Sequence, residues 1–293
     1  MQSIREHKWV LGFGLLYAAL ACYLIWVDLS YLVLAPIGLL GIYFAIFQTE
    51  YTFLALAFLT PLSINIEEYT DSFGLYLPTE PLLFGLMVLL LMQHFRKPLI
   101  PKYVWRNPIV WALGFYLFWI FITSITSTDP VASFKFLLAK LWFIVPLILF
   151  GPIVYKKHLN IERFIWLFTV AMVIAITYTL VVHASYGFGE EEGHWVMWPF
   201  FKDHTIYGST VAFITPLIFG IYLSKKHAPL VQVTLIALIG ITLLGLFFSY
   251  TRAAWLSVIA AILVLIAIKI RLKFSIIAGI VAIAGVFLFL SWD

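Results

Sequence analysis

The chain has 293 residues, of which 63% are hydrophobic and 11% charged, with a net charge of +4 and a mean hydropathy of +1.04. A soluble domain has roughly 25% charged residues, so this composition excludes a soluble globular protein and predicts an integral membrane protein. The one cysteine, Cys22, excludes an internal disulfide and a cysteine-based metal site. Walker, dinucleotide-binding and GxSxG motifs are missing from the sequence, so we expect no nucleotide-driven chemistry. We also expect no cofactor, no metal and no nucleic-acid partner.

Apolar runs between polar breaks predict an all-α, polytopic helix bundle, because a helix needs roughly 20 apolar residues to cross a membrane. About eleven transmembrane helices are expected in one domain over residues 1–293. The first follows Arg5 and Lys8 as a signal sequence would, but the many similar runs behind it favour an uncleaved span. Pro61 interrupts the third run. The runs lie near residues 9–27, 31–47, 51–66, 80–94, 108–127, 134–154, 161–183, 206–223, 230–248, 253–270 and 274–292.

The distribution of basic residues orients these spans. With a cytoplasmic N-terminus, 14 of the 18 Lys and Arg residues fall on the inside, as the positive-inside rule predicts. We therefore expect the N-terminus in the cytoplasm and the C-terminus outside. The inside basic residues are Arg5, Lys8, Arg96, Lys97, Lys102, Arg106, Lys156, Lys157, Arg163, Lys225, Lys226, Lys269, Arg271 and Lys273.

Four basic residues depart from this pattern and fall on the outer side or just below it: Lys135, Lys140, Lys202 and Arg252. Lys135 and Lys140 occur in "SFKFLLAKLW", and at about 1.5 Å rise per residue Lys140 lies roughly 8 Å deeper. An ionisable side chain within a span normally faces a polar cavity or partner. The alternative is that each lysine extends its ammonium group to the interface.

The segment "WPFFKDHTIYG" places Lys202, Asp203 and His204 just before the eighth span. Asp203 could cap that helix by accepting hydrogen bonds from its first amides, or it could contact substrate. His204 could serve as an acid, a base or a phosphate donor, or as a plain hydrogen-bonding residue at the interface.

Arg252, in "SYTRAAW", occupies a turn of only a few residues between two long apolar runs. A salt bridge to Glu80 or Asp203 would give it a structural role. The functional interpretation is an anion site, because a guanidinium group matches phosphate oxygens two at a time. Outward cations at membrane depth suit a substrate with a phosphate at headgroup level and a tail in lipid, such as a polyprenyl-pyrophosphate-linked sugar.

The segment 184–205 is dense in aromatic residues, among them Trp195. They are typical of an interfacial aromatic belt, or they provide a platform for sugar rings or a lipid tail. Three glutamates, Glu190 to Glu192, precede His194 there, but their spacing is not that of a zinc site.

"FFSYTRAAWLSVIAAIL" and "PFFKDHTIYGSTVAFITPL" resemble the O-antigen ligase and O-antigen polymerase superfamily of bacterial envelope glycosyltransferases. In that family a Ser/Thr-Arg pair and a nearby Trp open a span, as Thr251, Arg252 and Trp255 do here. The segment from Lys202 to Gly208 resembles the polar loop before the family's proline-bearing span, with Pro216 in place. The resemblance covers roughly residues 200–270.

The resemblance implies a multi-pass protein of the bacterial inner membrane that takes part in lipopolysaccharide biosynthesis. The implied reaction transfers a glycan from undecaprenyl pyrophosphate to an acceptor hydroxyl on lipid A-core, a growing polymer or a protein, without metal or nucleotide. Arg252 and His204 are then the expected catalytic residues. The expected substrate-binding residues are Lys202, Lys140, Lys135, Asp203, Trp195 and Trp255.

The family also has a large outer loop with a histidine proposed as general base, and the sequence ends at "FLFLSWD" before such a loop. We expect a longer natural protein of which this chain is the N-terminal part, inactive by itself. The alternatives are that His204 supplies the base or that the molecule does not catalyse. Two other functions stay open: a transporter or flippase for a lipid-linked or anionic solute, and a structural membrane subunit.

Overall fold

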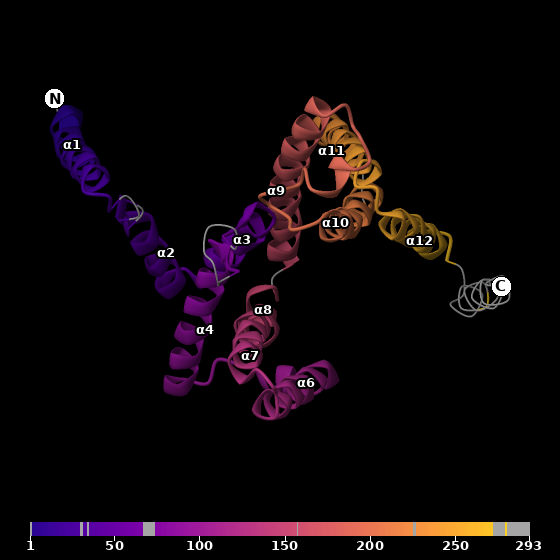
Figure 1. The fold of residues 1–293 in the computed structure, drawn as a ribbon, viewed down its shortest axis with the longest axis horizontal. Helices are drawn as coiled ribbons and strands as arrows, with labels where there is room; N and C mark the ends of the chain where they lie inside the picture. Colours follow the sequence, from indigo (N-terminus) through magenta and orange to yellow (C-terminus); the bar gives the residue numbers. More distant parts are fainter. Residues whose placement is uncertain are drawn as a thin grey trace. The chain divides into compact units, whose positions relative to one another are not determined.

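Apolar helices make up almost the whole of the computed structural model, and one short pair of strands accompanies them in its described residues (Figure 1). The structure describes residues 2–29, 32–33, 35–66, 74–156, 158–224, 227–271 and 279. The α-helices are α1 (Gln2–Trp26), α2 (Ala35–Phe47), α3 (Thr49–Leu59), α4 (Thr79–Arg96), α5 (Lys102–Trp105), α6 (Pro108–Ile125), α7 (Pro130–Ile144), α8 (Gly151–Val154), α9 (His158–Ser185), α10 (His204–Ser224), α11 (Pro229–Phe247) and α12 (Arg252–Lys269). The other elements are the 3-10 helices η2 (Thr60–Leu62) and η5 (Glu192–His194), the π-helix η4 (Val145–Phe150), and the strands β1 (Ile64–Asn65) and β2 (Tyr76–Leu77).

Within the described residues, six helical stretches are long and apolar enough to cross a membrane by length and composition. They confirm the all-α class and indicate a multi-pass membrane protein. The count of eleven spans and the sidedness of the termini stay predictions, and the eleventh run falls outside the described residues except for residue 279. The six stretches are Pro108–Ile125, Pro130–Val154, Ile161–Ser185, His204–Ser224, Pro229–Phe247 and Arg252–Lys269.

Proline and a capping side chain mark where α6 and α7 begin. Pro108 and Pro130 occupy the first helical positions, where a missing amide proton costs nothing. Asn107 accepts a hydrogen bond from the amide of Ile109 at 2.9 Å, and Asp129 accepts one from Ala132 at 3.1 Å. These caps satisfy amides that the helices themselves cannot pair.

The third predicted span differs from the structure. The helix ends at Leu59, and Pro61 follows inside η2, after which Ile64 pairs with Leu77 in an antiparallel hairpin. Proline disfavours helical geometry in the residue before it and donates no hydrogen bond. The α3 helix of 11 residues is therefore only about 17 Å long at 1.5 Å per residue, shorter than the roughly 30 Å hydrocarbon core.

The chain forms two compact units, residues 1–53 with 82–153 and residues 54–81 with 154–293. Since α3 and α4 contribute residues to both units, the predicted single domain over residues 1–293 stays a prediction. In the first unit α6 packs against α7, where Phe121 meets Phe134 with ring centroids 6.2 Å apart. α4 contacts the same unit's later segment through Phe84 and Trp142, whose centroids are 5.9 Å apart.

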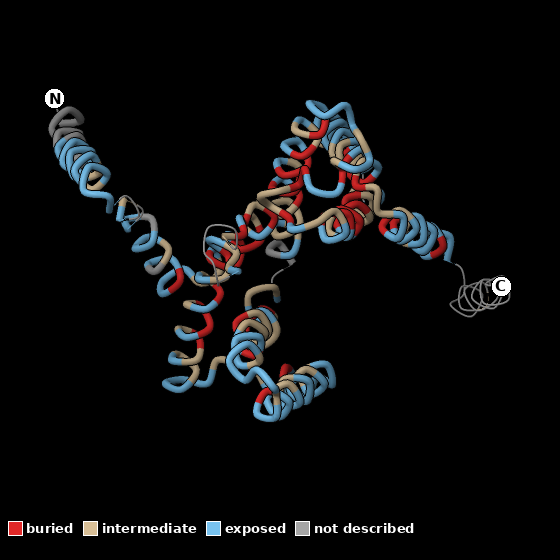
Figure 2. Tube along the Cα trace, viewed as in Figure 1, coloured by how far each residue is buried: buried red, intermediate tan, exposed pale blue. Residues whose placement is uncertain are grey.

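The second unit contains the main hydrophobic core, which follows α9 and α10 (Figure 2). α10 packs on α11 and α12, and α9 packs on α11 and η2. Ile176, Tyr207 and Leu235 are among the core side chains with at most 1% of their surface exposed. Val196 and Met197, from the connection between α9 and α10, are also buried in this core, so the connection is part of the packed unit.

Gly245 allows α11 to approach α9 and α10, and its replacement should test this packing. A methyl group there would lie 2.7 Å from Cγ2 of Ile176 and 2.8 Å from the phenol oxygen of Tyr207. We expect Gly245→Ala to lower the free energy of unfolding by about 1–3 kcal/mol, the usual cost of overpacking. Thermal unfolding in detergent measures this.

Gly240→Ala is the matched control on the same helix, because nothing lies within 4 Å of the added methyl group. It should leave stability unchanged or raise it by about 0.5–1 kcal/mol through helix propensity. Equal unfolding midpoints for the two variants would show that the close approach at Gly245 is not a constraint.

Candidate functional site

The first residues of α10 and α12 lie side by side in the second unit. The hydroxyl of Thr251 donates to the carbonyl oxygen of His204 at 3.0 Å, a bond between residues 47 apart in sequence. Gly208 faces this contact, and a methyl group there would lie 2.8 Å from Oγ1 of Thr251 and 2.9 Å from Oγ of Ser249. The structure therefore brings together the two segments that the sequence analysis singled out, and glycine supplies the room.

Arg252 begins α12, directly after Thr251, so its charge belongs to the same helix start. The side chain is exposed, and Thr251, at the N-cap position, makes no side-chain bond to the first amides of the helix. Within the described part of the chain Arg252 forms no ion pair, so neither Glu80 nor Asp203 neutralises it. A cation next to the positive end of a helix dipole is unfavourable by about 0.3–1 kcal/mol. A bound anion would interact favourably with both the guanidinium group and the positive end of the helix.

Asp203 caps α10, as one of the two predicted interpretations required. Its Oδ1 atom accepts hydrogen bonds from the amides of Thr205 at 2.8 Å and Ile206 at 2.9 Å, and from the Thr205 hydroxyl. Burial by itself would raise the pKa of the Asp203 carboxyl, but these hydrogen bonds outweigh it and the pKa lies below its ordinary value. Asp203 is therefore a carboxylate at neutral pH and serves the helix start.

His204 places an imidazole next to this helix start. Its ring stacks on that of His194, with centroids 4.2 Å apart and planes 25° apart, and it is partly exposed. No group of three His, Cys, Asp or Glu side chains in the described ranges is placed to hold a metal ion. Lys202, two residues earlier, is exposed. The ring of His204 thus contacts the α9–α10 connection through His194.

The two predicted tryptophans have different surroundings. Trp255 donates its indole N–H to the carbonyl oxygen of Leu246 at 2.6 Å, and its ring lies parallel to Phe247 with centroids 5.8 Å apart. It therefore fixes the turn between α11 and α12. Trp195 keeps half of its surface exposed and meets Tyr186 edge to face, so its ring is available to a ligand.

The aromatic connection between α9 and α10 is clamped to the turn that precedes Arg252. Tyr250 donates its phenol proton to the carbonyl oxygen of Phe188 at 2.8 Å, and Phe188 stacks on Phe248 with centroids 4.4 Å apart. The buried His183 bonds through Nε2 to the carbonyl oxygen of Gly189 at 2.7 Å. Much of the predicted belt or platform thus serves to hold this connection in place.

Sequence reasoning missed His183, Tyr250 and Gly208, which position the site. His183 belongs to a long apolar run, where one histidine gives no sign of its three aromatic neighbours, Phe188, Phe248 and Tyr250. Tyr250 directly precedes the Thr-Arg pair and has a positive φ of 51°, which is uncommon for tyrosine. Its position directly before the Thr-Arg pair in "SYTR" was the one sequence feature that could have indicated a role for Tyr250 at the site.

An open groove of about 850 Å³ runs between α10 and α12 below Arg252. Small residues of α12, Ala253, Ala254, Ser257 and Ala261, form one wall, and α10 from Thr205 to Leu217 forms the other. At 1.5 Å rise per residue the two walls are roughly 12 and 18 Å long, about half of the hydrocarbon thickness of a membrane. The groove is polar where the helices begin and apolar further along.

Lys135 and Lys140 belong to the first unit, whereas the residues described above belong to the second. Lys135 is exposed on α7. The Nζ atom of Lys140 lies 4.9 Å from the centroid of the Phe136 ring, a cation–π contact. The predicted grouping of all four outward cations in one substrate site therefore stays a prediction.

The cap at Asp203 should give α10 a measurable dependence on pH. Because the pKa is lower in the folded protein than in the unfolded chain, the contribution is present near neutral pH and lost as the pH falls through the folded pKa. Asp203→Ala should lower the free energy of unfolding by about 1 kcal/mol at pH 7. Asp203→Asn should keep most of the stability and show a weaker loss on acidification than the wild type. Unfolding midpoints in detergent between pH 3 and 7 measure both, and identical acid profiles for wild type and Asp203→Asn would contradict the assignment.

Tyr250→Phe should release the connection between α9 and α10 without harming the core. The variant keeps the ring against His183 and loses only the bond to Phe188, so amide hydrogen exchange should rise in residues 186–195. Tyr178→Phe is the matched control, since Tyr178 packs edge to face on Phe200 and no hydrogen bond of its hydroxyl occurs among the described residues. Equal exchange in both variants would show that the bond does not hold the connection.

Comparison with known proteins found no matching family model, no matching curated protein and no matching solved structure. The resemblance of residues 200–270 to the O-antigen ligase and polymerase superfamily therefore stays a prediction. The function of the site has to follow from its own geometry: an uncapped helix start with a guanidinium group, a neighbouring imidazole and an apolar groove below them.

Proposed function

We propose that the protein transfers a glycan from an undecaprenyl-pyrophosphate carrier to an acceptor hydroxyl, as O-antigen ligases and polymerases do, on the periplasmic side of the bacterial inner membrane. The observation that carries the proposal is the position of Arg252 at the polar end of the groove between α10 and α12. Arg252 stands in the chain between two residues that line the groove, Thr251 and Ala253. A ligand with a charged head and an apolar tail would place its head at Arg252 and its tail along the apolar part of the groove.

The anion of such a carrier would occupy the start of α12. Two features favour negative charge there: the uncapped amides of the first helical turn and the unpaired guanidinium of Arg252 among the described residues. The start of α10 is different, because Asp203 already supplies its negative charge. Of the two neighbouring helix starts, α12 is the one that a ligand phosphate would complete.

The tail of the carrier would follow the groove. Its α12 wall is built from alanine and serine, which leave room for a chain beside the helix, and its lower part contains Phe213 and Leu217 from α10. A small soluble anion would use Arg252 alone and would leave this apolar surface empty. The combination therefore favours an amphiphilic substrate.

In the proposed reaction the acceptor oxygen forms a bond to the anomeric carbon of the glycan. The bond from that carbon to the pyrophosphate oxygen breaks, and its electron pair stays on the pyrophosphate, where Arg252 stabilises the growing charge. The acceptor hydroxyl loses its proton to a base, for which we propose His204, with Lys202 near the same charge. The leaving pyrophosphate supplies the driving force, so the protein has to position and stabilise rather than provide energy.

The transporter or flippase alternative uses the same groove and the same cation without forming a covalent product. The open side of the groove favours it as the second candidate, because a lipid-linked anion could enter from the bilayer. Binding and transfer must therefore be measured separately.

The test compares Arg252→Lys with the wild type in lipid nanodiscs that contain an undecaprenyl-pyrophosphate-linked oligosaccharide and an acceptor. We expect Arg252→Lys to retain the carrier at least tenfold more weakly, because a lysine loses the bidentate bond, worth about 1.5–3 kcal/mol. Retained carrier and released undecaprenyl pyrophosphate are both measured by mass spectrometry.

Arg271→Lys, two residues past the end of α12, is the matched control and should behave as the wild type. Retention of carrier without release of undecaprenyl pyrophosphate in the wild type would reject His204 as the base in this chain. Equal retention by wild type and Arg252→Lys would reject the anion site itself.

A further inference from the structure

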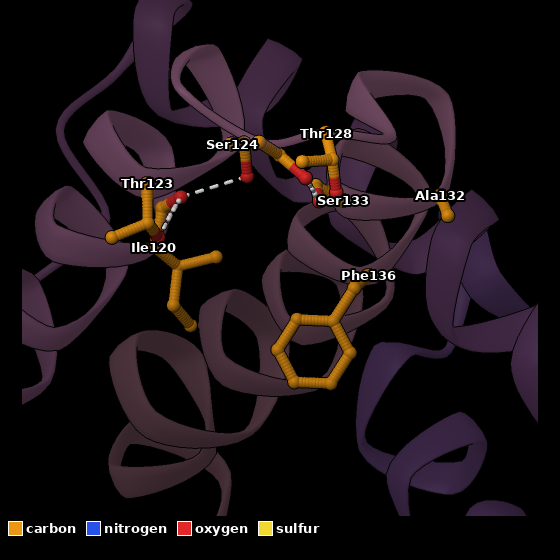
Figure 3. A pocket seen from close by; sticks show the side chains of 8 residues that line it. Ile120, Thr123, Ser124, Thr128, Ala132, Ser133 and Phe136 are labelled. Atoms are coloured by element: carbon orange, nitrogen blue, oxygen red, sulfur yellow. Dashed lines mark hydrogen bonds between the residues drawn. The ribbon is translucent and has the colours of Figure 1, made fainter.

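A hydroxyl-rich pocket lies in the first unit, at the turn between α6 and α7, outside the site described above. Its volume is about 550 Å³. Five hydroxyl side chains and one aromatic ring dominate its lining: Thr123, Ser124, Ser127, Thr128, Ser133 and Phe136. The hydroxyl groups lie on one side of the pocket and the Phe136 ring on another (Figure 3).

Most of these hydroxyl groups already donate their protons in hydrogen bonds within the protein. Thr123 donates to the carbonyl oxygens of Trp119 and Ile120 at 3.0 Å, and Ser124 donates to Ile120 at 2.7 Å. Ser133 donates to the hydroxyl of Ser127 at 2.7 Å, which in turn donates to the carbonyl oxygen of Asp129 at 3.1 Å. The pocket therefore offers acceptor oxygens to a ligand and few donors. A ligand that matches it has to bring its own hydroxyl protons.

A cation contacts one residue of the pocket lining, Phe136. Ala132, Phe136 and Lys140 follow one another at four-residue steps along one face of α7. Side chains on a helix lean toward its N-terminus, and Lys140 accordingly reaches Phe136, with Nζ 4.9 Å from the ring centroid. The ammonium group repels a cationic ligand and favours an anionic group beside the hydroxyls.

We propose that this pocket binds a polyhydroxylated headgroup attached to a phosphate, with the hydroxyls of the ligand donating to Thr123, Thr128 and their neighbours and the phosphate next to Lys140. Phe136, half exposed, supplies an apolar face for the carbon skeleton or the lipid chain. The pocket lies within about 9 Å of the α6–α7 turn at 1.5 Å per residue, the depth at which headgroups reside.

Two sources provide this chemistry: a glycerol phospholipid such as phosphatidylglycerol, and the sugar phosphate of a glycolipid. The proposal does not depend on glycan transfer, because the pocket belongs to a different unit from Arg252. An anionic lipid without hydroxyl groups, such as phosphatidic acid, would satisfy Lys140 and leave the acceptor oxygens of the pocket unused.

The experiment uses the full chain in phosphatidylcholine nanodiscs doped in turn with phosphatidylglycerol, phosphatidic acid or a polyprenyl-phosphate-linked hexose. Lipid retained per protein is counted by native mass spectrometry. We expect the wild type to retain at least one hydroxyl-bearing lipid about tenfold more strongly than phosphatidic acid, the effect of one or two hydrogen bonds. Which of the two is retained identifies the source.

Three variants test the parts of the site. Thr123→Val with Thr128→Val keeps side-chain shape and should abolish the preference over phosphatidic acid. Lys140→Met should weaken retention of all three anionic lipids. Lys135→Met removes the same charge about 140° around the helix from Lys140 and should weaken retention less than Lys140→Met does.

Retention of phosphatidic acid equal to that of both hydroxyl-bearing lipids would overturn the polyol part of the proposal. Retention of no anionic lipid above phosphatidylcholine would overturn the whole site. A preference that survives Thr123→Val with Thr128→Val would place the polyol elsewhere. Unfolding midpoints in phosphatidylcholine alone establish that each variant is folded. If the double variant is unstable, Thr128→Val alone repeats the test. The Thr128 hydroxyl has no hydrogen-bond partner among the described residues, so its loss leaves no protein group unpaired there.

Discussion

The hydrogen bond from Thr251 to the carbonyl oxygen of His204 fixes the geometry on which the candidate site depends. It joins the starts of α10 and α12, and Gly208 leaves the space that lets them meet. Two positive helix ends then face the same region, and Arg252 adds a third positive charge to it. Asp203 offsets one of the helix ends, so the remaining positive potential is concentrated at α12. Such an arrangement is stable in a bilayer interface only because water or a bound anion can reach it.

Apolar run length predicted most of the helices, because in a bilayer every backbone amide must be paired and a helix is the simplest solution. The prediction was wrong where hydrophobicity and backbone chemistry disagree. The run from 51 to 66 is apolar, yet Pro61 ends the helical geometry and the chain continues into a hairpin.

The candidate site was predictable where chemistry is local. Arg252 stood out because charge is rare within apolar runs, and the cap at Asp203 follows from the residues beside it. The positioning residues were not predictable, since their roles arise from contacts across long stretches of sequence. His183 contacts rings from both the α9–α10 connection and the end of α11. Trp255 donates its indole proton to the carbonyl oxygen of Leu246 on α11, so this proton is not available to a ligand. A tryptophan beside an arginine gives no hint of that choice.

The length of the groove between α10 and α12 has a consequence for carrier selection. It reaches only about half of the hydrocarbon thickness, roughly 12–18 Å along its walls. A long isoprenoid bound there would keep its first few units against protein and leave the others in the disordered interior of the bilayer. The protein would then recognise only the head of the carrier and the geometry of its first double bonds. Carriers of different length would be interchangeable, and the fluidity of the membrane, rather than protein contacts, would set how freely the distal part moves.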